Sequence, residues 1–295
     1  MFIDELIGGG PVITDGAWGT QLQSLGLSGG ACPDQWNLSH PELVERVPRA
    51  YVDAGSQVVL TNTFRANRIA LAHYDLADQT VDINRIGVEI SRRAVGDRAR
   101  VFATMGPCGK MLVAGETSRE ELREVFGEQA GALAAAGADA IVVETMSDVN
   151  EAEVALQAAK ETGLPVVACL VFDSGPNGDC TMTGVSPEEA TRWLAAAGAD
   201  VVGANCGHGI EGYIDICRRM RAATDKPLWI KPNAGTPEMV KGEVVYRTTP
   251  AEFAARAPAL LEAGAQFLGG CCGTGPDFIA ALCRNVPPQK SRDAV

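Results

Sequence analysis

The sequence predicts a single (β/α)8 barrel, and three observations carry this prediction. The chain has 295 residues, of which 46% are hydrophobic and 21% charged, so it can build one large core, and barrels of this length commonly form one domain. Short apolar runs alternate along the chain with amphipathic stretches of helical periodicity. Four of the joins repeat one pattern, in which an alanine-rich stretch ends at a glycine and an apolar run follows. We expect the barrel over residues 1–286 and a short polar tail over 287–295.

Eight candidate strands can be counted along the chain. They are rich in β-branched residues and largely apolar, as parallel strands buried on both faces are. We expect these strands at residues 11–14, 57–61, 100–104, 140–143, 166–171, 201–204, 227–231 and 266–269.

Helices are expected between the strands, among them 41–54, 119–136, 187–197 and 250–263. Ser39 and Ser186 each stand just before a proline-led stretch with glutamate in its first turn, which is a helix start signal. The glycines at the joins suit helix ends, where a left-handed backbone is needed. They are Gly55, Gly137, Gly198 and Gly264, with Gly163 in a variant of the same join.

A doubly wound open sheet is the structural rival, because it also alternates strands with helices. Such a sheet often carries a G-x-G-x-x-G fingerprint after its first strand. The first strand here is followed by Asp15, Gly16, Ala17 and Trp18, which does not match. We therefore favour the barrel and expect its chemistry at the carboxyl ends of the strands.

Composition disfavours several classes of protein. The formal net charge of −12 and the isoelectric point near 4.8 argue against a nucleic-acid binder. No apolar run approaches the roughly 20 residues of a membrane span. The first residues carry acids where a signal peptide carries positive charge. We expect a cytoplasmic protein whose nine cysteines are thiols.

Thiols, acids and amides gather where the predicted strands end. Cys206 follows the sixth strand, and Cys271 and Cys272 follow the eighth between glycines. Neighbouring strand residues point to opposite faces, so the last two thiols share a target only if the backbone turns, which glycine permits. Three converging thiolates indicate a zinc site with an open fourth position, the mark of a catalytic site. Ordinary buried cysteines and a strained vicinal disulfide are the alternatives.

The six other cysteines form two sets. Three are expected to be buried as small apolar side chains, namely Cys169, Cys217 and Cys283. Three lie in predicted loops and receive no role, namely Cys32, Cys108 and Cys180. His208 also receives no role, although we expect it to line the mouth or face solvent rather than bind metal.

A zinc ion held by three thiolates carries a net negative charge, so it activates water poorly. Such an ion can still bind a substrate thiol and keep it deprotonated at neutral pH. The cysteine pattern therefore points to alkylation of a small thiol.

Four segments together resemble the homocysteine S-methyltransferase family. They are the run 15–20, the pair Asn205-Cys206, the turn 232–235 and the Gly-Gly-Cys-Cys-Gly-Thr run at 269–274. The resemblance covers residues 15–282. It implies a zinc (Zn2+) barrel that methylates homocysteine to methionine, with Cys206, Cys271 and Cys272 as the zinc ligands.

Homocysteine is an amino acid, so its charged ends need partners. Glu144 ends the fourth strand and suits the ammonium group, a role that the resemblance also implies. Backbone N–H groups of the loop Gly16-Ala17-Trp18-Gly19, with Gly16 and Ala17 foremost, are expected to face the carboxylate. Asp15 either braces that loop or contacts the amino group. We also place Asn233 among the substrate-site residues. It either orients a zinc ligand or only stabilises the turn at 232–235.

The methyl donor is less well indicated. Betaine-using members of the family hold a quaternary ammonium with aromatic side chains, whereas this chain has Cys32, Arg65 and Met146 at the places we match to them. Segments 35–38 and 61–71 look most similar to the homocysteine module of cobalamin-dependent methionine synthase. No D-x-H-x-x-G cobalamin signature is present. The donor is then a small sulfonium such as S-methylmethionine, or methylcobalamin on a separate corrinoid protein.

Three other functions stay open from the sequence. The barrel could use its zinc on a different thiol or selenol acceptor, since fold alone does not define the substrate. It could act only as the subunit of a partner protein, or it could merely bind zinc or an amino acid without catalysis. No nucleic acid or membrane partner is expected, and the oligomeric state is not indicated.

Overall fold

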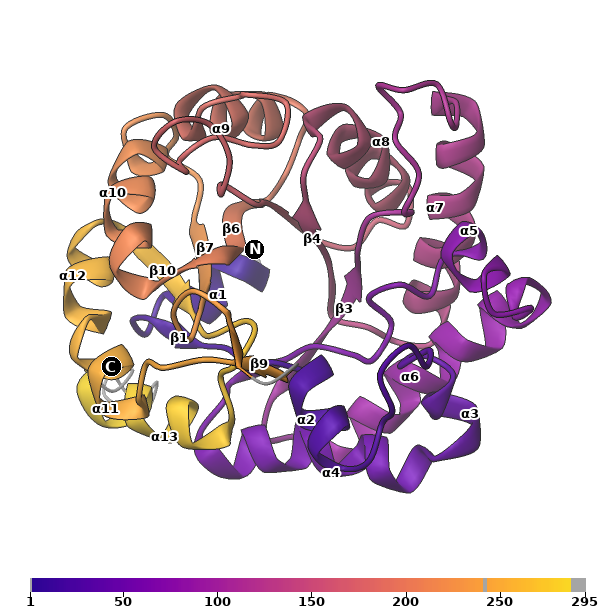
Figure 1. Cartoon of the computed structure of the whole chain (residues 1–295), viewed down its shortest axis with the longest axis horizontal. Helices are drawn as coiled ribbons and strands as arrows, with labels where there is room; N and C mark the ends of the chain where they lie inside the picture. Colours follow the sequence, from indigo (N-terminus) through magenta and orange to yellow (C-terminus); the bar gives the residue numbers. More distant parts are fainter. Residues whose placement is uncertain (1, 241–242, 288–295) are drawn as a thin grey trace.

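Eight parallel strands form a nearly closed barrel (Figure 1). The computed structural model describes residues 2–240 and 243–287. Around the barrel the strands follow the order β1-β10-β7-β6-β5-β4-β3-β2, which confirms the predicted fold class. Their bounds are β1 (Val12–Ile13), β2 (Val58–Val59), β3 (Arg100–Met105), β4 (Ala140–Met146), β5 (Val166–Leu170), β6 (Val201–Gly209), β7 (Leu228–Asn233) and β10 (Ala265–Leu268).

At the seam between β1 and β2, Gln57 makes two hydrogen bonds to Ile13. Its backbone N–H donates to the Ile13 carbonyl at 2.8 Å, and its side-chain Oε1 accepts from the Ile13 N–H at 2.9 Å. The side chain thus replaces one rung of the missing ladder, so the sheet has almost no free edge.

Helices surround the barrel on the outside (Figure 1). The long ones follow the strands, as expected of repeated strand–helix units. They are α4 (Pro41–Ala54), α6 (Thr80–Val95), α7 (Arg119–Ala135), α8 (Val149–Lys160), α9 (Pro187–Ala196), α10 (Ile210–Arg221) and α13 (Pro276–Asn285). The short ones are α1 (Phe2–Ile7), α2 (Gly19–Ser24), α3 (Trp36–Ser39), α5 (Arg68–Ala72), a 3-10 turn at Ala77–Gln79, α11 (Pro250–Ala255) and α12 (Ala257–Glu262).

Alternate strand residues face inward and fill the barrel. The rings of Phe102 and Trp229 stack at 5.9 Å, and Phe267 lies 5.2 Å from Trp229. Cys169 belongs to the same buried cluster, as predicted for it. Helix α1 contributes Ile3 to this cluster, and its Phe2 and Leu6 pack against it. The interior is therefore a packed core and not a channel.

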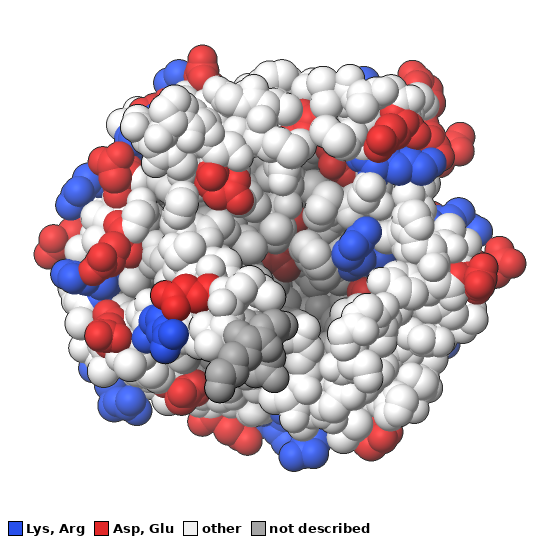
Figure 2. Space-filling view, viewed as in Figure 1, with Lys and Arg blue, Asp and Glu red and all other residues white. Residues whose placement is uncertain are grey.

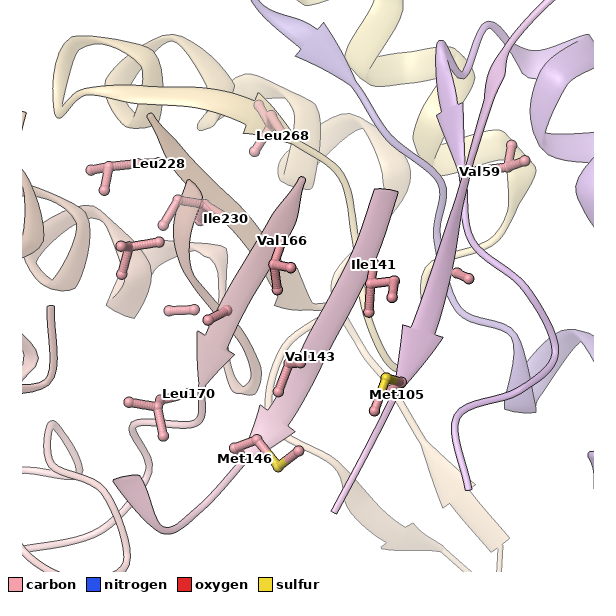
Figure 3. Packing of buried hydrophobic residues seen from close by; sticks show 14 of the residues in the cluster. Val59, Met105, Ile141, Val143, Met146, Val166, Leu170, Leu228, Ile230 and Leu268 are labelled. Carbon is pink, nitrogen blue, oxygen red and sulfur yellow. The ribbon is translucent and has the colours of Figure 1, made fainter. Parts of the chain in front are cut away.

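The other strand residues face outward and pack beneath the helices. Figure 3 shows part of this layer, including Ile141, Val143 and Leu170. Met146, at the end of β4, belongs to this outer layer and is fully buried. Its side chain therefore packs into the hydrophobic core and is not exposed to a donor. An irregularity in the pairing of β4 with β5, between Val143 and Met146, shifts the side chains there.

The predicted helix signals hold in most places. Gly55 is the left-handed C-cap of α4, and the backbone angle φ is also positive at Gly137, Gly163, Gly198 and Gly264. Ser186 caps α9 in a full capping box with Glu189.

Two helix details differ from the prediction. Ser39 does not cap α4, because Pro41 begins that helix and leaves His40 at the N-cap position, while Ser39 ends α3. The expected helix 250–263 is broken into α11 and α12. Pro258 has no N–H for a bond back to residue 254, and its ring would clash there, so the helix restarts at Ala257.

Two short strands lie outside the eight that were predicted. Strands β8 (Glu238–Val240) and β9 (Glu243–Val245) pair in antiparallel fashion between β7 and α11, on the side of the barrel that faces the viewer in Figure 1. Among the described helices, none combines the length and the hydrophobicity needed to cross a membrane. The expected polar tail, from residue 288 onward, lies outside the described residues.

Candidate metal centre and substrate site

Three thiols meet at the carboxyl ends of the strands. The Sγ atoms of Cys206, Cys271 and Cys272 all lie within 4.8 Å of one another, and those of Cys206 and Cys272 are 3.9 Å apart. All three side chains are half-buried. Figure 2 shows that this face of the molecule is hollowed at its centre, with acidic side chains deep inside. These cysteines could together hold a metal ion.

Unusual backbone angles bring the thiols together. Cys206 has a φ of 66°, which is rare for a residue with a side chain. The pairing of β6 with β7 slips between Cys206 and Gly209, so the end of β6 bends. Gly273 has a φ of 80°, and a Cβ there would lie 2.4 Å from the ring of Tyr246. Glycine is required at this turn for both reasons.

Asn233 joins the two loops that carry the cysteines. Its Nδ2 donates to the Gly207 carbonyl at 2.8 Å, and its Oδ1 accepts from the Cys272 N–H at 3.0 Å. Both ends of the amide are therefore used within the protein. Of the roles we expected for Asn233, this geometry favours orienting the cysteines over contacting substrate.

The three thiols are close enough to shift one another's pKa values. Hydrogen bonds from Cys271 and Cys272 lower the pKa of the Cys206 thiol to about 3. Their partnership with Cys206 raises the pKa of Cys272 to about 11 and that of Cys271 well above its usual value. A divalent ion bound there would favour ionisation of all three thiols.

Glu144 lies beside this cluster, at the end of β4. It is 7% exposed, and its Oε1 accepts from the Thr104 hydroxyl at 2.6 Å. Burial raises the pKa of Glu144, and this effect is opposed by the charge of Lys231 and by the Thr104 bond. The carboxylate has few partners of its own, so it retains capacity to accept hydrogen bonds from a ligand.

Asn205 links Glu144 to the thiols, and the sequence did not single it out beyond its motif. Its Nδ2 lies 3.4 Å from Glu144 Oε2 and 3.8 Å from Cys271 Sγ. It also holds Thr145, whose φ is 59°, through bonds to the Thr145 N–H and hydroxyl at 2.8 and 2.7 Å. Its place next to Cys206 at a strand end was the available signal.

Asp15 is fully occupied by the protein. Its Oδ1 lies 2.5 Å from Lys231 Nζ, and its Oδ2 accepts from the Trp18 indole and the Leu60 N–H, each at 2.8 Å. Of the two roles expected for Asp15, the geometry favours bracing the loop. Lys231 was missed, although a lysine in the otherwise apolar run of β7 is itself a signal.

In the loop after β1, one of the expected N–H groups is already used within the protein. The Ala17 N–H donates to the Thr274 carbonyl at 2.9 Å, so it is not free for a carboxylate and instead ties the loop to the cysteine turn. Tyr51 reinforces this tie by donating to the Ala17 carbonyl at 2.6 Å. Within the described chain, the N–H groups of Gly16 and Trp18 make no backbone or side-chain hydrogen bond, so these two are available.

The remaining candidates lie outside the thiol cluster. Cys32 and Cys108 are buried, which raises the pKa of their thiols to about 11 and about 12. His208 bonds the Gly178 carbonyl at 2.7 Å through Nε2. Arg65 is exposed, and its guanidinium lies against Gly109 in the loop after β3. A Cβ added at Gly109 would lie 2.7 Å from Arg65 Nη2.

Three cysteines that could hold a metal ion thus lie at the carboxyl end of a barrel, which is where enzymes of this fold place their active sites. The comparison with known families is specific. The family model described as Homocysteine S-methyltransferase matches residues 12–286, so the chain belongs to the homocysteine S-methyltransferase family, as the motifs indicated.

Relatives of two kinds match nearly the whole chain. Identity to "Methionine synthase" of Mycobacterium leprae (strain TN) is 32% over 299 residues, covering 93% of this chain and 24% of that protein. Identity to "Betaine--homocysteine S-methyltransferase 1" of Danio rerio is 30% over 319 residues, covering 98% and 76%. The chain spans about a quarter of the length of the methionine synthases that it matches.

A solved structure shares the fold. The metallated form of the homocysteine methyltransferase MmuM from Escherichia coli superimposes with a TM-score of 0.77 and 24% identity, covering 92% of this chain and 95% of that one. Its oxidized form gives a TM-score of 0.78 and 25% identity.

Proposed function

We propose that this chain transfers a methyl group to the thiol of homocysteine and so forms methionine, with Cys206, Cys271 and Cys272 holding a zinc ion. The observation that carries the proposal is the convergence of these three thiols beside the buried Glu144. The thiol cluster suits the sulfur end of an amino-acid thiol, and the Glu144 carboxylate suits its ammonium group.

The spacing of the thiols suits zinc. Tetrahedral zinc with Zn–S bonds near 2.3 Å separates its sulfur ligands by about 3.8 Å, and the distance between Cys206 and Cys272 is 3.9 Å. Soft thiolate donors also prefer this metal. Zinc bound there would supply a Lewis acid that lowers the pKa of the substrate thiol, leaving a nucleophile at neutral pH.

The other residues act on the amino-acid end. Glu144 accepts hydrogen bonds from the substrate ammonium, and the N–H groups of Gly16 and Trp18 donate to its carboxylate. Asp15 holds that loop, and Asn233 holds the cysteine turns in place. These contacts orient the substrate sulfur toward the donor, which is how positioning accelerates a displacement.

The reaction is a displacement at carbon. The substrate sulfur forms a bond to the donor methyl carbon while the bond from that carbon to the donor breaks, and its electron pair leaves with the donor. With a sulfonium donor the leaving group is a neutral thioether. The proton of the homocysteine thiol is released to solvent.

We further propose that the donor is not a quaternary ammonium. Neither Cys32 nor the exposed Arg65 is aromatic, so the cation–π contacts that would hold a quaternary ammonium are missing at these two positions. The charge of Arg65 opposes any cation, so it also argues, less strongly, against a sulfonium. A small sulfonium such as S-methylmethionine, or methylcobalamin on a separate corrinoid protein, are the donors to test.

The test is methionine formation by the purified, zinc-loaded protein. S-methylmethionine, betaine and methylcobalamin are offered separately with homocysteine, beside a Cys272→Ala control. Turnover with S-methylmethionine or with methylcobalamin supports the proposal and decides between its donors. Turnover with betaine overturns the donor argument. Failure to bind homocysteine overturns the acceptor assignment.

A further inference from the structure

Lys231 is a charged residue that the methyl transfer itself does not use. Among the residues that the structure describes, it is the only buried lysine or arginine, at 2% exposure. Its Nζ lies 2.5 Å from Asp15 Oδ1 and 5.8 Å from the centre of the Trp229 ring. A buried ammonium is costly unless it is paired, so its presence beside the substrate site calls for an account.

The ionisable groups buried around Lys231 are acids and thiols. Burial lowers the pKa of the Lys231 ammonium. The charges of Asp15 and Glu144 raise it by more than burial lowers it, so the pKa lies above its usual value. The thiol of Cys271 acts in the same direction. Lys231 is therefore protonated at neutral pH and offsets a concentration of negative charge.

The Lys231–Asp15 pair also sets the loop at the end of β1. Asp15 uses its second oxygen to hold the Trp18 indole and the Leu60 N–H, so the carboxylate bridges β7, β2 and the loop. The unused N–H groups of Gly16 and Trp18 belong to this loop. An unpaired Asp15 would place a negative charge directly beside them.

We propose that Lys231 is a positioning residue that admits the carboxylate of an amino-acid thiol to the loop at residues 16–18. By neutralising Asp15 it removes the repulsion that a substrate carboxylate would meet, and it fixes the orientation of the loop amides. Lys231 thereby makes the site selective for thiols that carry a carboxylate. This inference rests on the proposed function.

The test separates the two ends of the substrate with three thiols. Homocysteine carries both charged groups, 4-mercaptobutanoate lacks the ammonium, and 3-aminopropanethiol lacks the carboxylate. Binding of each is followed on the cobalt-substituted protein by its absorption spectrum, which needs no methyl donor. In Lys231→Met, we expect the Kd of the two carboxylate thiols to rise by about 10-fold or more and that of 3-aminopropanethiol by less than about threefold.

A second variant isolates charge from packing. Asp15→Asn combined with Lys231→Met removes both charges, and we expect it to recover carboxylate binding to within about threefold of the wild type. Lys160→Met is the control for loss of a paired lysine. Lys160 forms a partly exposed ion pair with Asp200 at 2.9 Å, next to the start of β6 and so at the opposite end of the barrel from the site. This control variant should leave all three Kd values unchanged.

Each outcome bears on a definite claim. Equal weakening of the three thiols in Lys231→Met, or no recovery in the double variant, overturns the role of Lys231. If Lys231→Met does not fold, Asp15→Asn should bind 4-mercaptobutanoate about 10-fold more tightly than the double variant, and equal affinity contradicts the proposal. If homocysteine does not change the absorption spectrum of the cobalt-substituted wild type, the proposed function is overturned instead.

Discussion

The Sγ atoms of Cys206 and Cys272 lie 3.9 Å apart although 66 residues separate them in the sequence. Cys206 belongs to β6, and Cys272 follows β10, with β7 between these strands in the sheet. The contact arises because both loops bend toward the space above β7, where Asn233 bonds each of them. The thiol cluster is thus a product of three strand ends acting together.

Replacing Cys272 by serine should remove most of the bound zinc and nearly all activity, because a hard hydroxyl replaces one of three soft ligands. Zinc content per chain and the initial rate of methionine formation are the measurements. Cys283→Ser, on α13, is the matched control and should retain both. Full zinc content in Cys272→Ser would remove this thiol from the ligand set.

Asn233→Ala should weaken zinc binding by about 10- to 100-fold, the range typical of groups that orient metal ligands. The variant loses both bonds that hold the cysteine turns, while the cysteines themselves remain. Competition with a chelator gives the affinity, and thermal unfolding shows whether the barrel is intact. An unchanged affinity would contradict the orienting role and reopen a substrate contact for Asn233.

Glu144→Gln should raise the KM for homocysteine about 10-fold or more, since a hydrogen bond to a charged group contributes about 1.5–3 kcal/mol. The amide keeps the size of the side chain and an acceptor oxygen but loses the charge. The KM for 4-mercaptobutanoate, which has no ammonium, should change little. Equal effects on both thiols would place the role of Glu144 elsewhere.

Acid should unfold the protein partly through Glu188. Hydrogen bonds from Arg219, at 2.7 and 2.9 Å, lower the pKa of Glu188 from 4.5 to about 2. A lowered folded-state pKa means that the ionised group stabilises the fold above pH 4.5, and that this contribution is lost as the pH falls toward 2.

The measurement is the Tm of the wild type and of Glu188→Gln across this pH range. Wild type should have the higher Tm above pH 4.5, and the difference should shrink as the pH falls. Glu120→Gln controls for the loss of one carboxylate, because Glu120 is exposed and forms no ion pair in the described chain. A constant difference at all pH values would contradict the pairing.

Much of the fold follows from local patterns. The strands at 11–14 and 100–104 were placed by their apolar runs, and α9 by Ser186, whose capping box is present. The break at Pro258 and the β8–β9 pair were not foreseen. The helix breaks because the Pro258 ring would clash with the carbonyl four residues before it. The β8–β9 strands are short and lack the apolar periodicity that predicts the other strands.

The site was only partly visible in the sequence. Cys206, Cys271, Cys272 and Glu144 stood out as reactive residues at strand ends, and the structure places them together. The sequence does not single out Lys231, and the Ala17 N–H that we expect to face a carboxylate is used within the protein. In both cases the deciding fact is what lies opposite the residue, namely Asp15 for Lys231 and the Thr274 carbonyl for Ala17.

The sequence by itself determined the repeating strand–helix order, the ends of most elements and the identity of the reactive groups. These depend on periodicity, capping and turn preferences, which act between residues a few positions apart. Only the tertiary structure decided which groups face one another. Asp15 and Lys231 are 216 residues apart and meet only because closing the barrel brings β1 and β7 to either side of β10, so a long-range geometry and not a local preference assembles the site.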